Sequence, residues 1–70
     1  MEEVKAHITG TVWKIEVKAG QAVKEGDVLV ILESMKMEMP IEAPIDGTVS
    51  KVLVSEAQSV AEGDVVVVID

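Results

Sequence analysis

A single lysine between two methionines, Met35-Lys36-Met37, lies near the middle of the 70-residue chain. A solvated lysine has a pKa of about 10.4, so only about 0.04% of it is neutral at pH 7. A catalytic Schiff-base lysine is buried or lies beside another cation, whereas Lys36 has carboxylates nearby, at Glu33 and Glu38, that favour its charged form. We therefore expect Lys36 to be unreactive by itself and suited to acylation by another enzyme.

The methionines and glutamates around Lys36 each allow two interpretations. Methionine is apolar, unbranched and adaptable, so Met35 and Met37 suit a surface that meets several partners, although they would also pack within a hairpin. Glu33 and Glu38 could be an acid–base pair, but a solvated hairpin does not separate two carboxylate pKa values. We therefore expect the glutamates to contact the enzyme that modifies Lys36 or another partner.

The sequence repeats itself with a spacing of 37 residues. When residues 6–33 are aligned without a gap on residues 43–70, 14 of 28 positions are identical. Solenoids need three or more such units, so two units predict a pair related by a pseudo-two-fold axis. Lys36 follows just after the first unit, on the connection to the second.

The hydrophobic pattern predicts seven or eight short strands and no helix. Val and Ile dominate the apolar residues, and no stretch has a helical period. Expected strands are 4–8, 11–18, 28–32, 37–43, 48–54 and 65–69, with a short segment at 21–24. Glycines indicate turns at Gly10, 25–27 and 62–64, the last two organised by Asp27 and Asp64. The expected fold class is all-β, a sandwich or small barrel.

Two local features refine this pattern. Val12 is out of phase with an inward-facing Trp13, and Val49 repeats the misfit in the second unit, so we expect a β-bulge at 12–14 and another at 49–51.

The connection that carries Lys36 is short. Only residues 33–36 join strands 28–32 and 37–43, which is the length of a tight hairpin with Lys36 exposed at or beside its tip. Pro40 cannot donate to a ladder, so the second strand of this hairpin is expected at a sheet edge or to begin there.

Composition limits the function classes. The net charge of −7 and a single aromatic residue, Trp13, argue against nucleic acid as a partner. The absence of cysteine excludes a disulfide scaffold, and His7 as the lone histidine makes a metal site unexpected. No catalytic constellation is visible, so we expect no enzyme.

Length and termini give three further expectations. The 70 residues predict one domain, 1–70. The longest apolar run, 65–69, is too short to span a bilayer, so no membrane partner is expected. The acidic start lacks a signal-peptide pattern, which makes the cytoplasm the default location, with a mitochondrial matrix as the alternative.

Three segments resemble one family. Residues 33–38, Glu-Ser-Met-Lys-Met-Glu, resemble the biotin-attachment motif, usually Ala-Met-Lys-Met or Ser-Met-Lys-Met. Residues 43–49 look like the Ala-Pro-x-x-Gly-x-Val segment of biotinyl/lipoyl-attachment domains, and residues 62–65 match their closing turn and strand. The resemblance covers essentially the whole chain and is closest to small stand-alone biotin/lipoyl attachment proteins and biotin carboxyl carrier domains.

The resemblance implies a fold and a role. The fold is a flattened β-barrel of two four-stranded antiparallel sheets with pseudo-two-fold symmetry, a barrel-sandwich hybrid. Biotin protein ligase would transfer biotin from biotinyl-adenylate to Lys36. The biotin arm would then carry CO2 from a biotin carboxylase to a carboxyltransferase, and the chain itself would catalyse nothing.

The chain departs from the family pattern in ways that leave alternatives open. It has no room for the protruding thumb of some acetyl-CoA carboxylase carriers, His7 replaces a common proline, and Ala57 stands where Gly20 predicts glycine. Lipoyl domains usually show Asp-Lys-Ala, preceded by Glu and Ser or Thr. Glu33-Ser34 fits that preference, so lipoate, attached by a lipoate ligase, is the alternative cofactor, and a pure interaction module is the alternative class.

Overall fold

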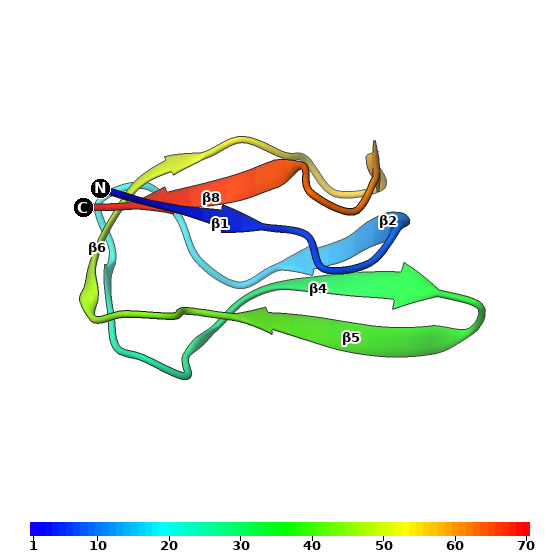
Figure 1. Cartoon of the computed structure of the whole chain (residues 1–70), viewed down its shortest axis with the longest axis horizontal. Coiled ribbons are helices and arrows are strands. Elements are labelled where there is room, and N and C mark those ends of the chain that lie inside the picture. The colour runs from blue at the N-terminus through cyan, green and yellow to red at the C-terminus, as the bar shows by residue number, and fades with distance from the viewer.

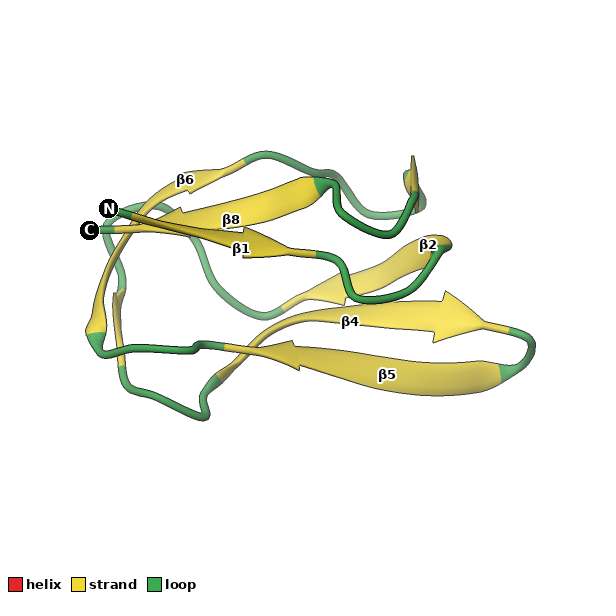
Figure 2. Ribbon diagram, viewed as in Figure 1, coloured by secondary structure: helices red, strands yellow, loops and turns green.

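The computed structural model describes residues 1–70 and consists of strands and loops without a helix (Figures 1 and 2). The strands are β1 Glu2–Lys5, β2 Gly10–Ile15, β3 Ala22–Val23, β4 Val28–Ser34, β5 Met37–Glu42, β6 Gly47–Val52, β7 Ser59–Val60 and β8 Val65–Ile69. They form two four-stranded antiparallel sheets, β1-β8-β6-β3 and β5-β4-β2-β7. No helix in the structure is long and apolar enough to cross a membrane.

The sheets follow the sequence repeat. The bounds of β6 lie 37 positions after those of β2, and the bounds of β7 lie 37 positions after those of β3. In the same way β8 corresponds to β4, and β1 corresponds to β5. When each strand of the order β1-β8-β6-β3 is replaced by its counterpart, the result is the order of the other sheet, β5-β4-β2-β7, which is the expected pseudo-two-fold arrangement.

The two halves interlock through exchanged backbone pairing. The short strand β3 pairs with β6 of the second half, and β7 pairs with β2 of the first. The turns repeat the exchange, since Gly20 N–H donates to the Val49 carbonyl at 2.7 Å and Ala57 N–H donates to the Val12 carbonyl at 2.8 Å. Each half therefore supplies hydrogen-bond partners that the other half needs.

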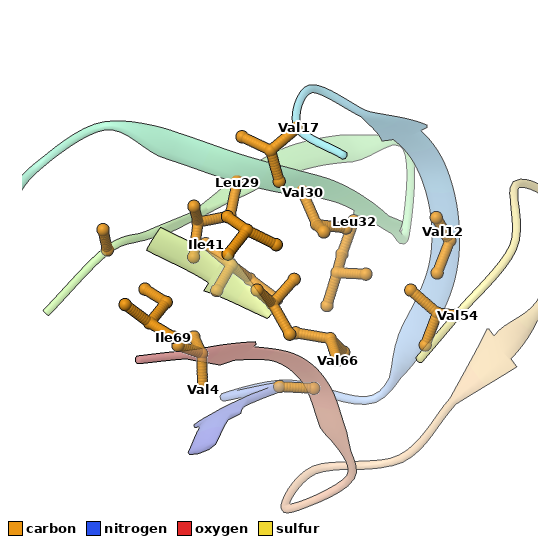
Figure 3. Close-up of a cluster of buried hydrophobic side chains, with 14 of the residues drawn as sticks. Val4, Val12, Val17, Leu29, Val30, Leu32, Ile41, Val54, Val66 and Ile69 are labelled. Atoms are coloured by element: carbon orange, nitrogen blue, oxygen red, sulfur yellow. The ribbon is translucent and has the colours of Figure 1, made fainter. Parts of the chain in front are cut away.

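The core between the sheets is entirely apolar. All 17 buried residues are Val, Leu, Ile or Ala, and no polar or charged side chain is buried. Figure 3 shows Leu32 of β4, Val12 of β2 and Val66 of β8 converging between the ribbons.

Both predicted bulges are present. The register shifts between Val12 and Lys14 in the β2–β4 pair and between Val49 and Lys51 in the β6–β8 pair. Val12 and Val49 are buried, whereas Trp13 is 48% exposed, so the expectation that Trp13 faces inward is wrong. The reason is the bulge itself, which adds an unpaired residue and reverses the inward phase at that point.

The aspartate turns are confirmed. Asp27 Oδ2 accepts the N–H of Lys24 at 2.9 Å, and Asp64 Oδ2 accepts the N–H of Ala61 at 2.9 Å. Each carboxylate satisfies a backbone donor three residues before it, which fixes the turn that leads into a core strand.

Gly10 is not in a turn, contrary to expectation. It begins β2, where a Cβ would lie 2.7 Å from the Glu33 carbonyl oxygen. Its counterpart Gly47 begins β6, where a Cβ would lie 2.5 Å from the Asp70 carbonyl oxygen. Both glycines therefore allow close approach of neighbouring backbones rather than a change of chain direction.

Candidate functional site

The β4–β5 hairpin places Lys36 in a turn of two residues. The pairing continues to Ser34 and Met37, so only Met35 and Lys36 lie between the strands. Their φ angles are 52° and 66°. Positive φ at both central residues is the type I′ pattern, which matches the right-handed twist of the flanking strands.

This conformation is unusual for these residue types. Type I′ turns favour Asn-Gly, and an L-residue with a side chain in left-handed conformation costs roughly 1–2 kcal/mol. The β4–β5 ladder leaves only Met35 and Lys36 to reverse the chain, and two-residue hairpin loops use turns with positive φ at one or both central residues. Backbone strain of this kind is often found at functional positions.

The Lys36 side chain is free in solvent. Lys36 is exposed, and it takes part in no salt bridge; the ion pair in the molecule joins Lys14 and Glu16 at 3.7 Å. Lys36 lies in the turn between β4 and β5, and Figure 1 shows this turn at the end of the molecule away from both termini. A partner enzyme can therefore reach the amine without displacing a competing contact.

Glu33 and Glu38 lie directly opposite each other, one step before the turn. Both are exposed, and opposite residues in an antiparallel pair share a face. Two like charges in that arrangement weaken the pair slightly, so their placement serves the fold poorly and suits contact with a partner. Neither carboxylate forms a salt bridge with Lys36.

The opposite face of the hairpin is apolar. Ser34, Met37 and Met39 lie on this face, because they alternate along the strands with the glutamates of the other face. Toward the core, the same face includes the buried Leu32. Outside the core, an open hollow of about 160 Å³ lies against this face and is lined by Ile8, Ser34, Met35, Met37 and Met39. Lys36 therefore stands between an acidic pair on one side and an apolar surface on the other.

The structure brings all five sequence-predicted site residues onto one hairpin: Glu33, Met35, Lys36, Met37 and Glu38. Sequence reasoning missed Ile8 and Ser34 as lining residues of the hollow and left Met39 without a role. Ile8 lies in the loop between β1 and β2, far from Lys36 in sequence, and no local pattern links them.

No group of three or more His, Cys, Asp or Glu side chains is arranged to hold a metal ion. The site therefore consists of one free amine, its two flanking thioethers, two carboxylates and an apolar hollow. That set can accept a covalent group and present recognition surfaces to a partner.

The chain belongs to the biotin/lipoyl family, whose model, described as "Biotin-requiring enzyme", matches residues 2–69. The predicted family and the predicted flattened barrel of two four-stranded sheets are both confirmed.

Two curated relatives have similar sequences. One is the biotin/lipoyl attachment protein of Bacillus subtilis (strain 168), 50% identical over 40 residues, or 57% of this chain and 55% of that protein. The other is the biotinylated protein TB7.3 homolog of Mycobacterium leprae (strain TN), 50% identical over 42 residues, or 60% of this chain and 59% of that protein. The matched segment thus spans little more than half the length of these relatives.

A solved structure shows the same fold within a much longer protein. The urea carboxylase of Kluyveromyces lactis superposes on 99% of this chain with a TM-score of 0.93 and 38% identity, and the match covers 6% of that protein.

Proposed function

We propose that this chain is a biotin carrier and that Lys36 is the residue to which biotin is attached. The observation that carries this proposal is an exposed, unpaired lysine in a two-residue turn, between Met35 and Met37, in a chain of the biotin/lipoyl family.

The chemistry of attachment would come from a biotin protein ligase. The ligase would remove a proton from the Lys36 ammonium, and the free Nζ would attack the carbonyl of biotinyl-adenylate. The new amide bond forms as the bond to AMP breaks, and the charge on the side chain is lost. The open hairpin supports this step, because no neighbouring side chain covers the amine or competes for it.

The loaded arm would carry CO2 between two partner sites. A biotin carboxylase would carboxylate the biotin ring, and a carboxyltransferase would pass the carboxyl group to an acceptor. The domain is 31 Å long, and its two termini lie at the end opposite the hairpin (Figure 1). A domain joined to a partner at that end would therefore present Lys36 away from the junction. The superposition on urea carboxylase supports a biotin-dependent carboxylase as the system served.

The test is the intact mass of the chain after coexpression with a biotin protein ligase. We expect one added biotinyl group, lost in Lys36→Arg. Lys51→Arg, at another exposed lysine on a strand, is the matched control and should remain labelled. A chain that gains no mass, or a Lys36→Arg variant that is still labelled, would overturn the proposal. A chain that is never modified but binds through Met35 and Met37 would instead be an interaction module.

Lipoate is the second candidate cofactor. Glu33-Ser34 upstream of the lysine matches the preference of lipoyl domains, and one relative is named a biotin/lipoyl attachment protein. The same mass experiment with a lipoate ligase in place of the biotin ligase separates the two. Loading by both enzymes, each abolished by Lys36→Arg, would define a dual carrier.

A further inference from the structure

Three of the four methionines of this chain are exposed, and they differ in their position relative to Lys36. Met35 is 92% exposed and Met37 is 61% exposed, and both flank the lysine. Met1 is 90% exposed but lies at the opposite end of the molecule (Figure 1). Exposed thioethers are readily oxidised to sulfoxides, so all three can react, but only two of them border the attachment turn.

Oxidation of either flanking methionine would change the surface beside Lys36. Met35 and Met37 line the apolar hollow together with Ile8 and Met39. A sulfoxide is polar and is a strong hydrogen-bond acceptor, so it would remove the apolar character of this lining. A sulfoxide oxygen next to Lys36 in sequence could also accept a hydrogen bond from the ammonium, which is otherwise unpaired.

We propose that Met35 and Met37 form an oxidation-sensitive switch that controls the loading of Lys36. This inference rests on the proposed function, because it concerns the rate at which a ligase attaches biotin to that lysine. Reduced methionines allow loading, and methionine sulfoxide at either position slows it.

The reaction needs only a hydroperoxide. The thioether sulfur attacks one peroxide oxygen, the O–O bond breaks, and an S–O bond forms. The sulfur loses two electrons, and with hydrogen peroxide the other oxygen leaves as hydroxide and takes the remaining proton to become water. A thiol-dependent sulfoxide reductase reverses the change, so the switch can be reset.

The fold should survive this modification. Neither flanking side chain belongs to the buried core, and the β4–β5 ladder uses backbone groups that oxidation does not touch. A change in loading would therefore report the surface at the turn rather than unfolding. Circular dichroism of the oxidised chain provides the check.

The experiment compares loading rates before and after hydrogen peroxide, using the full chain, purified biotin protein ligase, biotin and ATP. Peptide mass mapping locates each gain of about 16 Da. We expect sulfoxide at Met35 and Met37 and a loading rate at least about fivefold lower. Reductase with dithiothreitol should restore the rate.

Two double variants assign the effect to position. Met35→Leu/Met37→Leu keeps apolar side chains of similar volume that cannot be oxidised, so its treated and untreated rates should be equal. Met1→Leu/Met39→Leu retains both flanking methionines and should keep the full peroxide sensitivity of the natural chain.

The outcomes separate this inference from the proposed function. If the untreated chain is never loaded, the proposed function fails and the switch fails with it. If loading proceeds at the same rate with sulfoxide mapped to Met35 and Met37, only the switch is overturned. Peroxide sensitivity that persists in Met35→Leu/Met37→Leu would equally overturn it.

Discussion

The two ends of this barrel are built on the same plan but finish differently. At one end β4 turns into β5 through Met35 and Lys36; at the other end β8 stops beside β1, where both termini lie (Figure 2). The strand pairs β4–β5 and β8–β1 correspond in the repeat. Leu32 lies opposite Met39 in β4–β5, and Ile69 lies opposite Glu2 at the equivalent position of β8–β1. One end is closed by a strained turn, whereas the other is left open.

This difference shows which features belong to the scaffold and which belong to the site. The bulges, the exchanged short strands and the aspartate turns occur in both halves, so they serve the fold. The left-handed lysine turn and the apolar hollow occur only at the hairpin end, where Met39 replaces the acidic counterpart Glu2. The site is thus an addition to a symmetric framework.

The strongest test builds a second hairpin at the open end. In this circular permutant, Asp70 would be joined to Met1 through an inserted Ser-Met-Lys-Met, and new termini would be opened between Met35 and Lys36. Lys36→Arg would remove the natural lysine, so that only the inserted lysine can be labelled. Asp70 then takes the place of Glu33, so we expect labelling of the inserted lysine. The rate should be roughly a tenth of the natural one, because Glu2 replaces an apolar lining residue.

The measurement for this permutant is intact mass over time with biotin protein ligase. Its control is the same permutant with arginine in place of the inserted lysine. A folded permutant that is never labelled would show that the ligase reads features found only at the natural hairpin end.

The next effect compares the two glycines at close backbone contacts. Gly47→Ala should destabilise the fold by about 2–3 kcal/mol, because the new Cβ meets both the Asp70 carbonyl and Ile69. Those contacts would be 2.5 and 2.6 Å. Gly10→Ala meets one backbone oxygen at 2.7 Å and should cost less, about 1–2 kcal/mol. Urea unfolding measures both, and the reverse order would contradict the comparison.

A smaller effect tests the paired turns at Gly20 and Ala57. Both have positive φ, 92° and 73°, and Gly20 has open space where a Cβ would be. Gly20→Ala should therefore cost about 1–2 kcal/mol through backbone strain alone. Ala57→Gly should stabilise by less, about 0.5 kcal/mol, since relief of strain is partly offset by the greater freedom of glycine in the unfolded chain. Thermal unfolding checks both signs, and a destabilised Ala57→Gly would refute this account.

The smallest effect concerns the aspartate turns. Asp27→Ala and Asp64→Ala each remove one solvent-exposed hydrogen bond to a backbone N–H and should each cost about 0.5–1 kcal/mol. Because the two turns have the same geometry, the two losses should be equal within error in urea unfolding. Asp27→Asn retains an oxygen acceptor and should lose less. Clearly unequal losses would mean that the halves do not share this device.

Much of the fold was predictable because its signals are local or repeated. The misfit of Val12 and Val49 predicted both bulges. The short connection 33–36 predicted the hairpin, and Pro40 predicted that its second strand lies at a sheet edge or begins there; β5 is the outer strand of its sheet. All five site residues were also predicted to share one hairpin. These features depend on side-chain alternation and chain length between strands, which a sequence states directly.

Other features could not be predicted from local patterns. Trp13 was expected inward, but the bulge exposes it, and Gly10 looked like a turn but begins a strand. The hollow depends on Ile8, which reaches the hairpin only through the packing of the β1–β2 loop. Each of these outcomes depends on a partner that is distant in sequence.

The sequence alone determined the all-β class, the two-fold repeat, the bulges, the aspartate turns and the exposed lysine between methionines. The tertiary structure decided the left-handed conformation of Met35 and Lys36, the exchange of β3 and β7 between halves and the apolar hollow beside the lysine. The physical reason is one of range. Alternation and turn chemistry act between neighbours along the chain, whereas turn geometry and surface shape are fixed only when distant strands pair in one register.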